Sequence, residues 1–150
     1  MTMRYAIVDA AVRPDTPQAL RYFIEGHPAR SLFENQPEHA LGDAAPWLVQ
    51  VDGNPGMAGW LPALDLEAGA VTWLASPADF GRLYQHLQRQ LDLRMPDGSL
   101  ALLRYWDGRV FRRLLRVLDA EQKRELLGPI EQWQVTVDDR LYALRKDSLA

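Results

Sequence analysis

The sequence predicts an α/β protein of the α+β kind, a single domain over residues 1–150 in which helices pack on a mixed β-sheet and the chain ends in a β-hairpin. Short aliphatic runs typical of strands alternate along the chain with amphipathic stretches typical of helices. The composition, 47% hydrophobic and 25% charged residues over 150 residues, is ordinary for one globular domain. The last two apolar runs flank Asp138-Asp139-Arg140, which favours the C-terminal hairpin.

The first part of the chain contains two strand signals separated by a helix signal. Residues 4–8 are short, aliphatic and rich in strand-forming side chains. Thr16 can cap a helix, Pro17 suits its first turn and Gly26 suits its exit. Residues 27–45 predict a long connection with a short strand at 31–33, and residues 46–51 predict the next strand.

The middle of the chain predicts a turn, a helix and a central strand. Residues 52–56 are rich in turn formers and lack the Lys-Ser/Thr of a phosphate loop. Residues 57–66 suggest a short helix broken near Pro62, and residues 70–75 are apolar on both faces, as in a buried central strand. Ser76, Pro77 and Asp79 then predict the start of a helix with apolar residues at helical spacing.

The last third predicts two hairpins on either side of two helices. Asp97-Gly98 marks a tight turn between strands at 93–95 and 100–105. Residues 108–118 form a strong helical pattern, and Asp119 can cap a further helix that runs to residue 127 and stops at Gly128. Strands at 130–137 and 141–145 then flank the second turn.

Composition and motifs exclude several classes of function. The chain has no cysteine, so disulfides, thiol catalysis and cysteine metal sites are excluded. No apolar run reaches the roughly 18 residues of a membrane span, and the apolar stretch near Met1 is too short for the core of an export signal. These observations predict a cytoplasmic protein that has no membrane partner.

No group of residues predicts an enzyme. His27, His39 and His86 have no second histidine or carboxylate at a metal-ligand spacing, and we interpret them as exposed histidines. Ser31, Ser76, Ser99 and Ser148 lie outside any nucleophile motif. We therefore expect no catalytic residue, no cofactor and no metal site.

Charge is distributed unevenly although the net charge is only −3. Residues 1–81 carry a net charge of −6, residues 82–124 carry +5 and residues 125–150 carry −2. This pattern predicts a molecule with an acidic and a basic side. The overall negative charge makes nucleic acid an unsuitable partner.

Residues 103–110 predict a junction at which a strand becomes a helix. Asp107 can accept amide hydrogens at the helix start, and Arg104 and Arg109 can pair with Asp107 or another acid. We interpret these three residues as a structural junction. The alternative is a small-ligand-binding protein or enzyme that uses a pocket near Trp106, Asp107 and Arg109.

The helix after the junction carries a stripe of arginines. Arg109, Arg112, Arg113 and Arg116 recur at the spacing that places side chains on one side of a helix, with apolar residues opposite. A solvated helix face is one explanation. The other is a binding surface for an acidic protein partner, because arginine makes bidentate contacts with carboxylates and no acid separates these four residues.

The order of several segments resembles a known family. The segments are Tyr5-Ala-Ile-Val-Asp-Ala10, Leu32-Phe33, Ala45-Pro-Trp-Leu-Val49, Trp73-Leu-Ala-Ser76, residues 83–87, Pro96-Asp-Gly98 and Arg104-Tyr-Trp-Asp-Gly-Arg109. Together they resemble the domain of unknown function family 4123 (DUF4123), the bacterial type VI secretion effector adaptors or chaperones, over about residues 5–135. The resemblance differs at Gly108, where the family usually has proline, and the chain ends soon after the second hairpin, where many members carry a C-terminal effector-binding region.

The resemblance implies a role before secretion. Such adaptors bind a cognate toxic effector in the producing cell and help to load it onto the spike, a trimer of the valine-glycine-repeat type (VgrG). It implies protein partners, namely the effector and the spike protein, and neither catalysis nor a cofactor.

Overall fold

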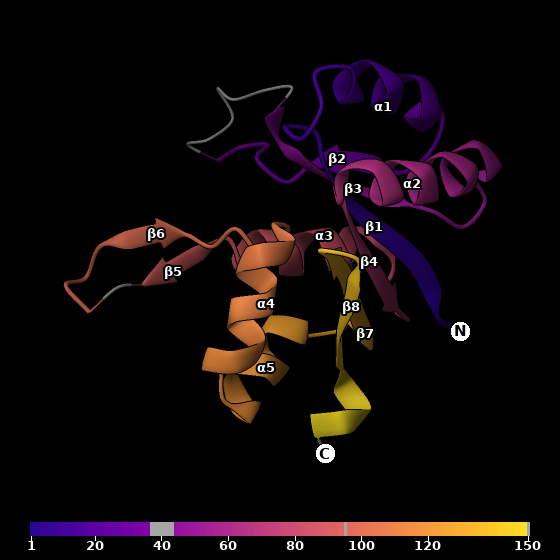
Figure 1. Ribbon diagram of the computed structural model, residues 1–150. Coiled ribbons are helices and arrows are strands. Elements are labelled where there is room, and N and C mark those ends of the chain that lie inside the picture. Colours follow the sequence, from indigo (N-terminus) through magenta and orange to yellow (C-terminus); the bar gives the residue numbers. More distant parts are fainter. Residues whose placement is uncertain (37–43, 95, 150) are drawn as a thin grey trace.

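A six-stranded antiparallel sheet organises the computed structural model, which describes residues 1–36, 44–94 and 96–149 (Figure 1). Its strand order is β2-β3-β1-β4-β7-β8. The strands are β1 (Met3–Asp9), β2 (Ala29–Ser31), β3 (Pro46–Gln50), β4 (Val71–Ser76), β7 (Gln132–Val137) and β8 (Arg140–Arg145). The α+β class and the C-terminal hairpin are thereby confirmed. The expected mixed sheet is corrected to an antiparallel one, because each pairing within it is antiparallel.

Helices cover both faces of this sheet. Helices α1 (Thr16–Ile24) and α2 (Pro55–Ala68) lie on one side, and α3 (Phe80–Arg89), α4 (Gly108–Val117) and α5 (Ala120–Leu127) lie on the other (Figure 1). Alternation along β1 explains why both sides are apolar, since Tyr5 and Ile7 join one cluster while Ala6 and Val8 join the other. None of the helices in the described ranges is long and apolar enough to cross a membrane.

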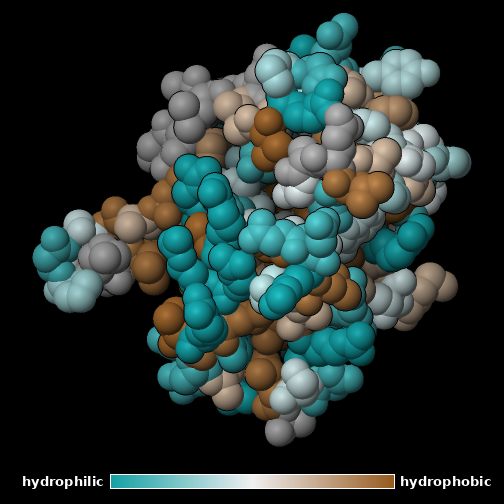
Figure 2. All heavy atoms as spheres, viewed as in Figure 1, coloured by the Kyte–Doolittle hydropathy of each residue, from teal (hydrophilic) through white to brown (hydrophobic). Residues whose placement is uncertain are grey.

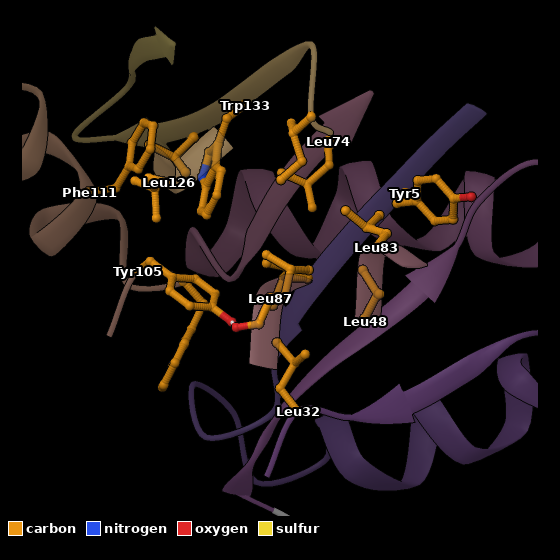
Figure 3. Close-up of a cluster of buried hydrophobic side chains, with 14 of the residues drawn as sticks. Tyr5, Leu32, Leu48, Leu74, Leu83, Leu87, Tyr105, Phe111, Leu126 and Trp133 are labelled. Carbon is orange, nitrogen blue, oxygen red and sulfur yellow. Dashed lines mark hydrogen bonds between the residues drawn. The ribbon is translucent and has the colours of Figure 1, made fainter. Parts of the chain in front are cut away.

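The larger core is built around aromatic rings (Figure 3). Trp133 of β7 stacks on Phe111 of α4 with 5.1 Å between ring centroids, and Tyr105 meets the same indole edge-on at 5.5 Å. The Tyr105 hydroxyl donates to the carbonyl of Leu87 at 2.7 Å. Burial raises the pKa of Tyr105 well above its ordinary value, so this phenol is a structural donor that holds the junction against α3.

Two helix starts differ from the predictions. Asp15 rather than Thr16 is the N-cap of α1, and Asp79 rather than Ser76 caps α3 by accepting from the amide of Arg82 at 2.9 Å. Ser76 ends β4, where its hydroxyl donates to the carbonyl of Pro129 at 2.7 Å. Serine and aspartate are both good caps, so local sequence alone did not distinguish them.

The helix expected to break at Pro62 is continuous. It begins earlier than predicted because the Asn54 side chain accepts from the amide of Met57 at 3.2 Å and caps it. Pro62 is exposed, while Met57, Leu61 and Leu64 are buried against the sheet and stabilise the helix by their packing. The short strand expected at 31–33 lies slightly earlier, as β2, and residues 32–36 form turns.

His86 is buried, which contradicts the prediction that it is an exposed histidine. Only 5% of the residue is exposed, and its Nε2 lies 2.7 Å from the carbonyl of Leu126, so this nitrogen carries the proton. A β-carbon at Gly128 would lie 2.3 Å from the ring. Glycine at 128, with a φ of +52°, therefore leaves room for the imidazole between α3 and the start of β7.

Candidate functional site

Helix α4 begins where the sequence predicted the junction. The Asp107 carboxylate accepts from the amide of Arg109 at 3.0 Å and so caps the helix. Phe111 is fully buried, and Leu114, Leu115 and Leu118 are partly buried against the core. This packing turns the opposite side of the helix, with its arginines, away from the core.

Gly108 allows α4 to approach β7 closely. A β-carbon at this position would lie 2.7 Å from Cγ2 of Val137. Because atoms cannot pack at that distance, a side chain at residue 108 would push the helix or the strand aside. The contact fixes the first turn of α4 against the turn of the β7–β8 hairpin.

The four arginines of the predicted stripe have different surroundings. Arg109 is 73% exposed and pairs with Asp107, with 3.5 Å between Nε and Oδ1. Arg112 is half-buried, lies 3.7 Å from the Asp138 carboxylate, and places its guanidinium 5.9 Å from the centre of the Tyr142 ring. Arg113 and Arg116 are exposed. The stripe is therefore partly a solvated face and partly a contact with the C-terminal hairpin.

A groove of about 450 Å³ lies between α4 and β8, lined by Arg112, Leu115, Arg116 and Tyr142. We call it the α4–β8 groove. In the view of Figure 2, hydrophilic spheres gather over the region where Figure 1 places α4 and β8, with hydrophobic spheres among them. An apolar floor flanked by guanidinium groups suits a ligand that is itself partly apolar and partly acidic.

Tyr142 was not among the residues predicted for the site. Alternation along 140–145 offered a signal, because Leu144 is buried on the helix-covered face and Tyr142 must share that face. The sequence does not indicate which element lies beside β8, since only the folded chain shows that α4 runs there.

A second hollow, of about 420 Å³, lies at the junction itself. Asp9, Arg104, Asp107 and Arg109 line it together with Trp106. Burial raises the pKa of Asp9, an amide hydrogen bond from Ala11 and the charge of Arg104 lower it, and Asp107 raises it. We call this the junction hollow.

The structure brings the predicted junction residues together without the predicted pairing of Arg104. None of the ion pairs among the described residues includes Arg104, whose charge lowers the pKa of Asp9. The Trp106 ring is buried and meets Phe33 and Tyr105 edge-on, so it contributes to the core more than to the hollow.

The remaining candidate groups do not converge. His27 is exposed, and His39 lies outside the described residues. Within the ranges that the structure describes, no group of three or more histidine, cysteine, aspartate or glutamate residues is arranged to hold a metal ion.

Most of the chain matches the sequence model of a protein family. The model described as "Domain of unknown function (DUF4123)" matches residues 4–125. The chain belongs to this family. The match runs from β1 into α5, so it includes the junction and the arginines of α4, whereas β7 and β8 follow it. Comparisons with curated proteins and with solved structures find no match.

Proposed function

We propose that the protein is a type VI secretion effector adaptor. It binds a cognate toxic effector in the cytoplasm of the producing bacterial cell and helps to load it onto a spike protein of the valine-glycine-repeat type, without catalysing a reaction and without a cofactor. Membership of the DUF4123 family supports the class of function. The observation that carries the proposal is the α4–β8 groove, in which Arg112 and Arg116 flank Leu115 and Tyr142.

The chemistry of the groove favours a protein as the ligand. Arginine and tyrosine are enriched among the residues that dominate protein–protein affinity, because each combines a large contact area with directed hydrogen bonds. Exposed ion pairs alone contribute little. Here the guanidinium groups border an apolar floor, so an acidic segment that also carries apolar side chains would bury Leu115 and Tyr142 and neutralise Arg116.

Capture of the client tests the proposal. Tagged protein is purified from a lysate of its own host grown with secretion genes expressed, and the bound proteins are identified by mass spectrometry. We expect stoichiometric recovery of one large toxin-like protein or a spike component. A clean preparation without either of these would contradict the adaptor function.

Charge reversal on α4 tests where the client binds. Arg113→Glu with Arg116→Glu reverses two exposed charges and should reduce capture at least about tenfold. Arg112 is left unchanged because glutamate there would face Asp138. Arg82→Glu with Arg89→Glu is the matched control, since it reverses two exposed charges on α3. Equal capture by both double variants, with unchanged melting, would remove α4 from the interface.

The junction hollow supports a second candidate, a small-ligand-binding protein or enzyme. The observation that supports this candidate is the partly buried carboxyl of Asp9, which lies close to the cationic side chain of Arg104. A native-state ligand raises the melting temperature by mass action. A metabolite screen in which one compound stabilises the protein, but not an Asp9→Asn variant, would favour this function over the adaptor.

A further inference from the structure

We propose that the outer edge of β8 accepts an additional β-strand, an extended acidic segment of the protein partner. The identity of that partner rests on the proposed function, whereas the free edge itself is a property of the fold. The edge adjoins the α4–β8 groove through Tyr142, so one segment can pair with the strand and occupy the groove.

The register shows which backbone groups are free. Asp138 and Asp139 both have positive φ, so a two-residue turn joins β7 to β8 and makes Val137 and Arg140 a hydrogen-bonded pair. Such pairs alternate along the hairpin, and the bond from the Lys146 amide to the Glu131 carbonyl at 2.9 Å continues the same series.

The residues between those pairs direct their backbone away from β7. The N–H and C=O groups of Leu141, Ala143 and Arg145 therefore point to the outer edge of the sheet. Among the described residues only the Ser148 hydroxyl bonds one of them, at the Arg145 carbonyl. Leu141 and Ala143 are exposed, and their outward groups form an unused template for pairing.

The two edges of the sheet differ in how well they suit a new strand. The opposite edge, β2, has three residues and leads into a turn where Arg30 pairs with Glu34 at 2.9 Å. β8 has six residues in unbroken register with β7, contains no proline, and exposes 64% of Leu141. Short length, proline and bulges are common ways to block an edge, and β8 has none of them.

Side chains next to the edge define the chemistry of the added strand. Arg140 and Tyr142 alternate onto the face of β8 that α4 covers, and Tyr142 lines the groove with Arg112 and Arg116. Arg145 and Lys146 follow at the other end of β8 and are exposed. An incoming strand with carboxylates on the α4 side and apolar side chains between them would match this arrangement.

A second copy of the chain fits this edge less well. In the two-fold antiparallel register that pairs residue 141 with 145 and residue 143 with itself, Arg140 of each copy lies opposite Lys146 of the other, the first residue after β8. Like charges directly opposite each other destabilise a strand pair. The charges thus favour an acidic strand from another protein over self-association.

Proline at residue 143 tests the edge without breaking the hairpin. Ala143 uses its N–H only outward, so Ala143→Pro removes a donor from the edge and keeps every β7–β8 bond. The matched control is Ala143→Thr, which retains the N–H. We expect Ala143→Pro to lower capture of the client at least about tenfold while Ala143→Thr binds as the wild type does.

A synthetic probe tests the edge independently of the client. The probe is a blocked peptide of about seven residues that alternates glutamate with valine, and its control carries lysine for glutamate. We expect the glutamate peptide to bind saturably and to slow amide exchange at Leu141, Ala143 and Arg145. We expect the lysine peptide not to bind the wild-type protein, and the glutamate peptide not to bind the Ala143→Pro protein.

The outcomes separate this proposal from the adaptor function. Client capture that Ala143→Pro leaves intact, in protein that melts normally, would overturn the added strand while the adaptor function stands. Equal binding of both peptides would also overturn the added strand, as would binding of the glutamate peptide to the Ala143→Pro protein. Concentration-dependent dimerisation that Ala143→Pro blocks would instead identify a second copy of the chain as the occupant. If no client exists, the peptide result alone decides whether β8 accepts a strand.

Discussion

Two hairpins in this protein begin from similar local signals and end in different environments. The turn after β5 (Asp92–Arg94) contains Asp97-Gly98, and the turn after β7 contains Asp138-Asp139. The β5–β6 hairpin, completed by β6 (Leu100–Leu102), projects from the body as a separate two-stranded ribbon (Figures 1 and 2). The β7–β8 hairpin is instead part of the sheet and packs under α4.

The difference shows that a turn motif specifies a hairpin without specifying its burial. Leu93 and Leu100 of the projecting ribbon are 47% and 60% exposed, whereas Trp133 and Leu144 of the sheet hairpin are buried. A two-stranded ribbon alone is marginally stable. We therefore expect the same kind of substitution to have very different effects in the two hairpins.

The largest expected effect is at Trp133. Trp133→Ala removes a fully buried indole that stacks on Phe111, and it should lower the free energy of unfolding by about 3–5 kcal/mol. Trp133→Phe should cost less, because the indole N–H has no hydrogen-bond partner among the described residues and its loss offsets part of the cavity. Urea titration measures both, and similar losses for the two variants would contradict this reasoning.

The next effect is at the contact between α4 and β7. Gly108→Ala should destabilise by about 1–2 kcal/mol, although alanine is the better helix former, because its β-carbon meets Val137. Combining it with Val137→Ala should recover part of the loss, and a double-mutant cycle measures the coupling. Additive losses would show that the close approach does not matter.

A smaller effect depends on pH and involves the connection into β7. Burial is the main cause that lowers the pKa of His86, with Arg89 and Lys146 adding to it and the Leu126 carbonyl opposing it. Below about pH 6.5 the unfolded chain binds a proton that the folded chain does not, so stability should fall as the pH drops from about 7 towards the lower folded pKa. Urea titrations at several pH values should show that His86→Gln loses this pH dependence and that His27→Gln retains it. If the free energy of unfolding of His86→Gln changed with pH as the wild type's does, His86 would be excluded as the source.

The smallest effect is expected in the projecting ribbon. Leu100→Ala should change the free energy of unfolding by no more than about 0.5 kcal/mol, because its side chain is mostly in solvent. A loss comparable with that of Trp133→Ala would show that the ribbon packs against something in solution. Matched urea titrations of the two variants give the comparison directly.

Local chemistry made much of the fold predictable. Asp107 and Asp119 cap α4 and α5 as expected, because a cap depends only on residues within one turn of the helix. The turn at Asp138-Asp139 was predictable for the same reason, since aspartate tolerates the positive φ that both residues adopt.

Features that depend on distant neighbours were not predictable. His86 is buried because Gly128, far along the chain, leaves room for its ring. The groove requires α4 to lie beside Tyr142, and no local pattern encodes that proximity. Arg112 has the same spacing as its neighbours in the stripe, yet only the fold places it against Asp138. The sequence thus predicted the arginines of the candidate site but not the surface that they share with β8.

The position of β4 in the sheet has a consequence for how the chain reaches its structure. β4 pairs with β1 on one side and with β7 on the other, so Thr72 is matched with both Ile7 and Val135. Contacts between residues so far apart in sequence require long loops to close, and the conformational entropy of those loops is lost before the contacts stabilise the chain. Such contacts therefore slow folding. Before β7 has docked, the backbone N–H and C=O groups along that edge of β4 are unpaired. A nascent chain at that stage would offer other strands an apolar partner, and docking of the β7–β8 hairpin covers this edge.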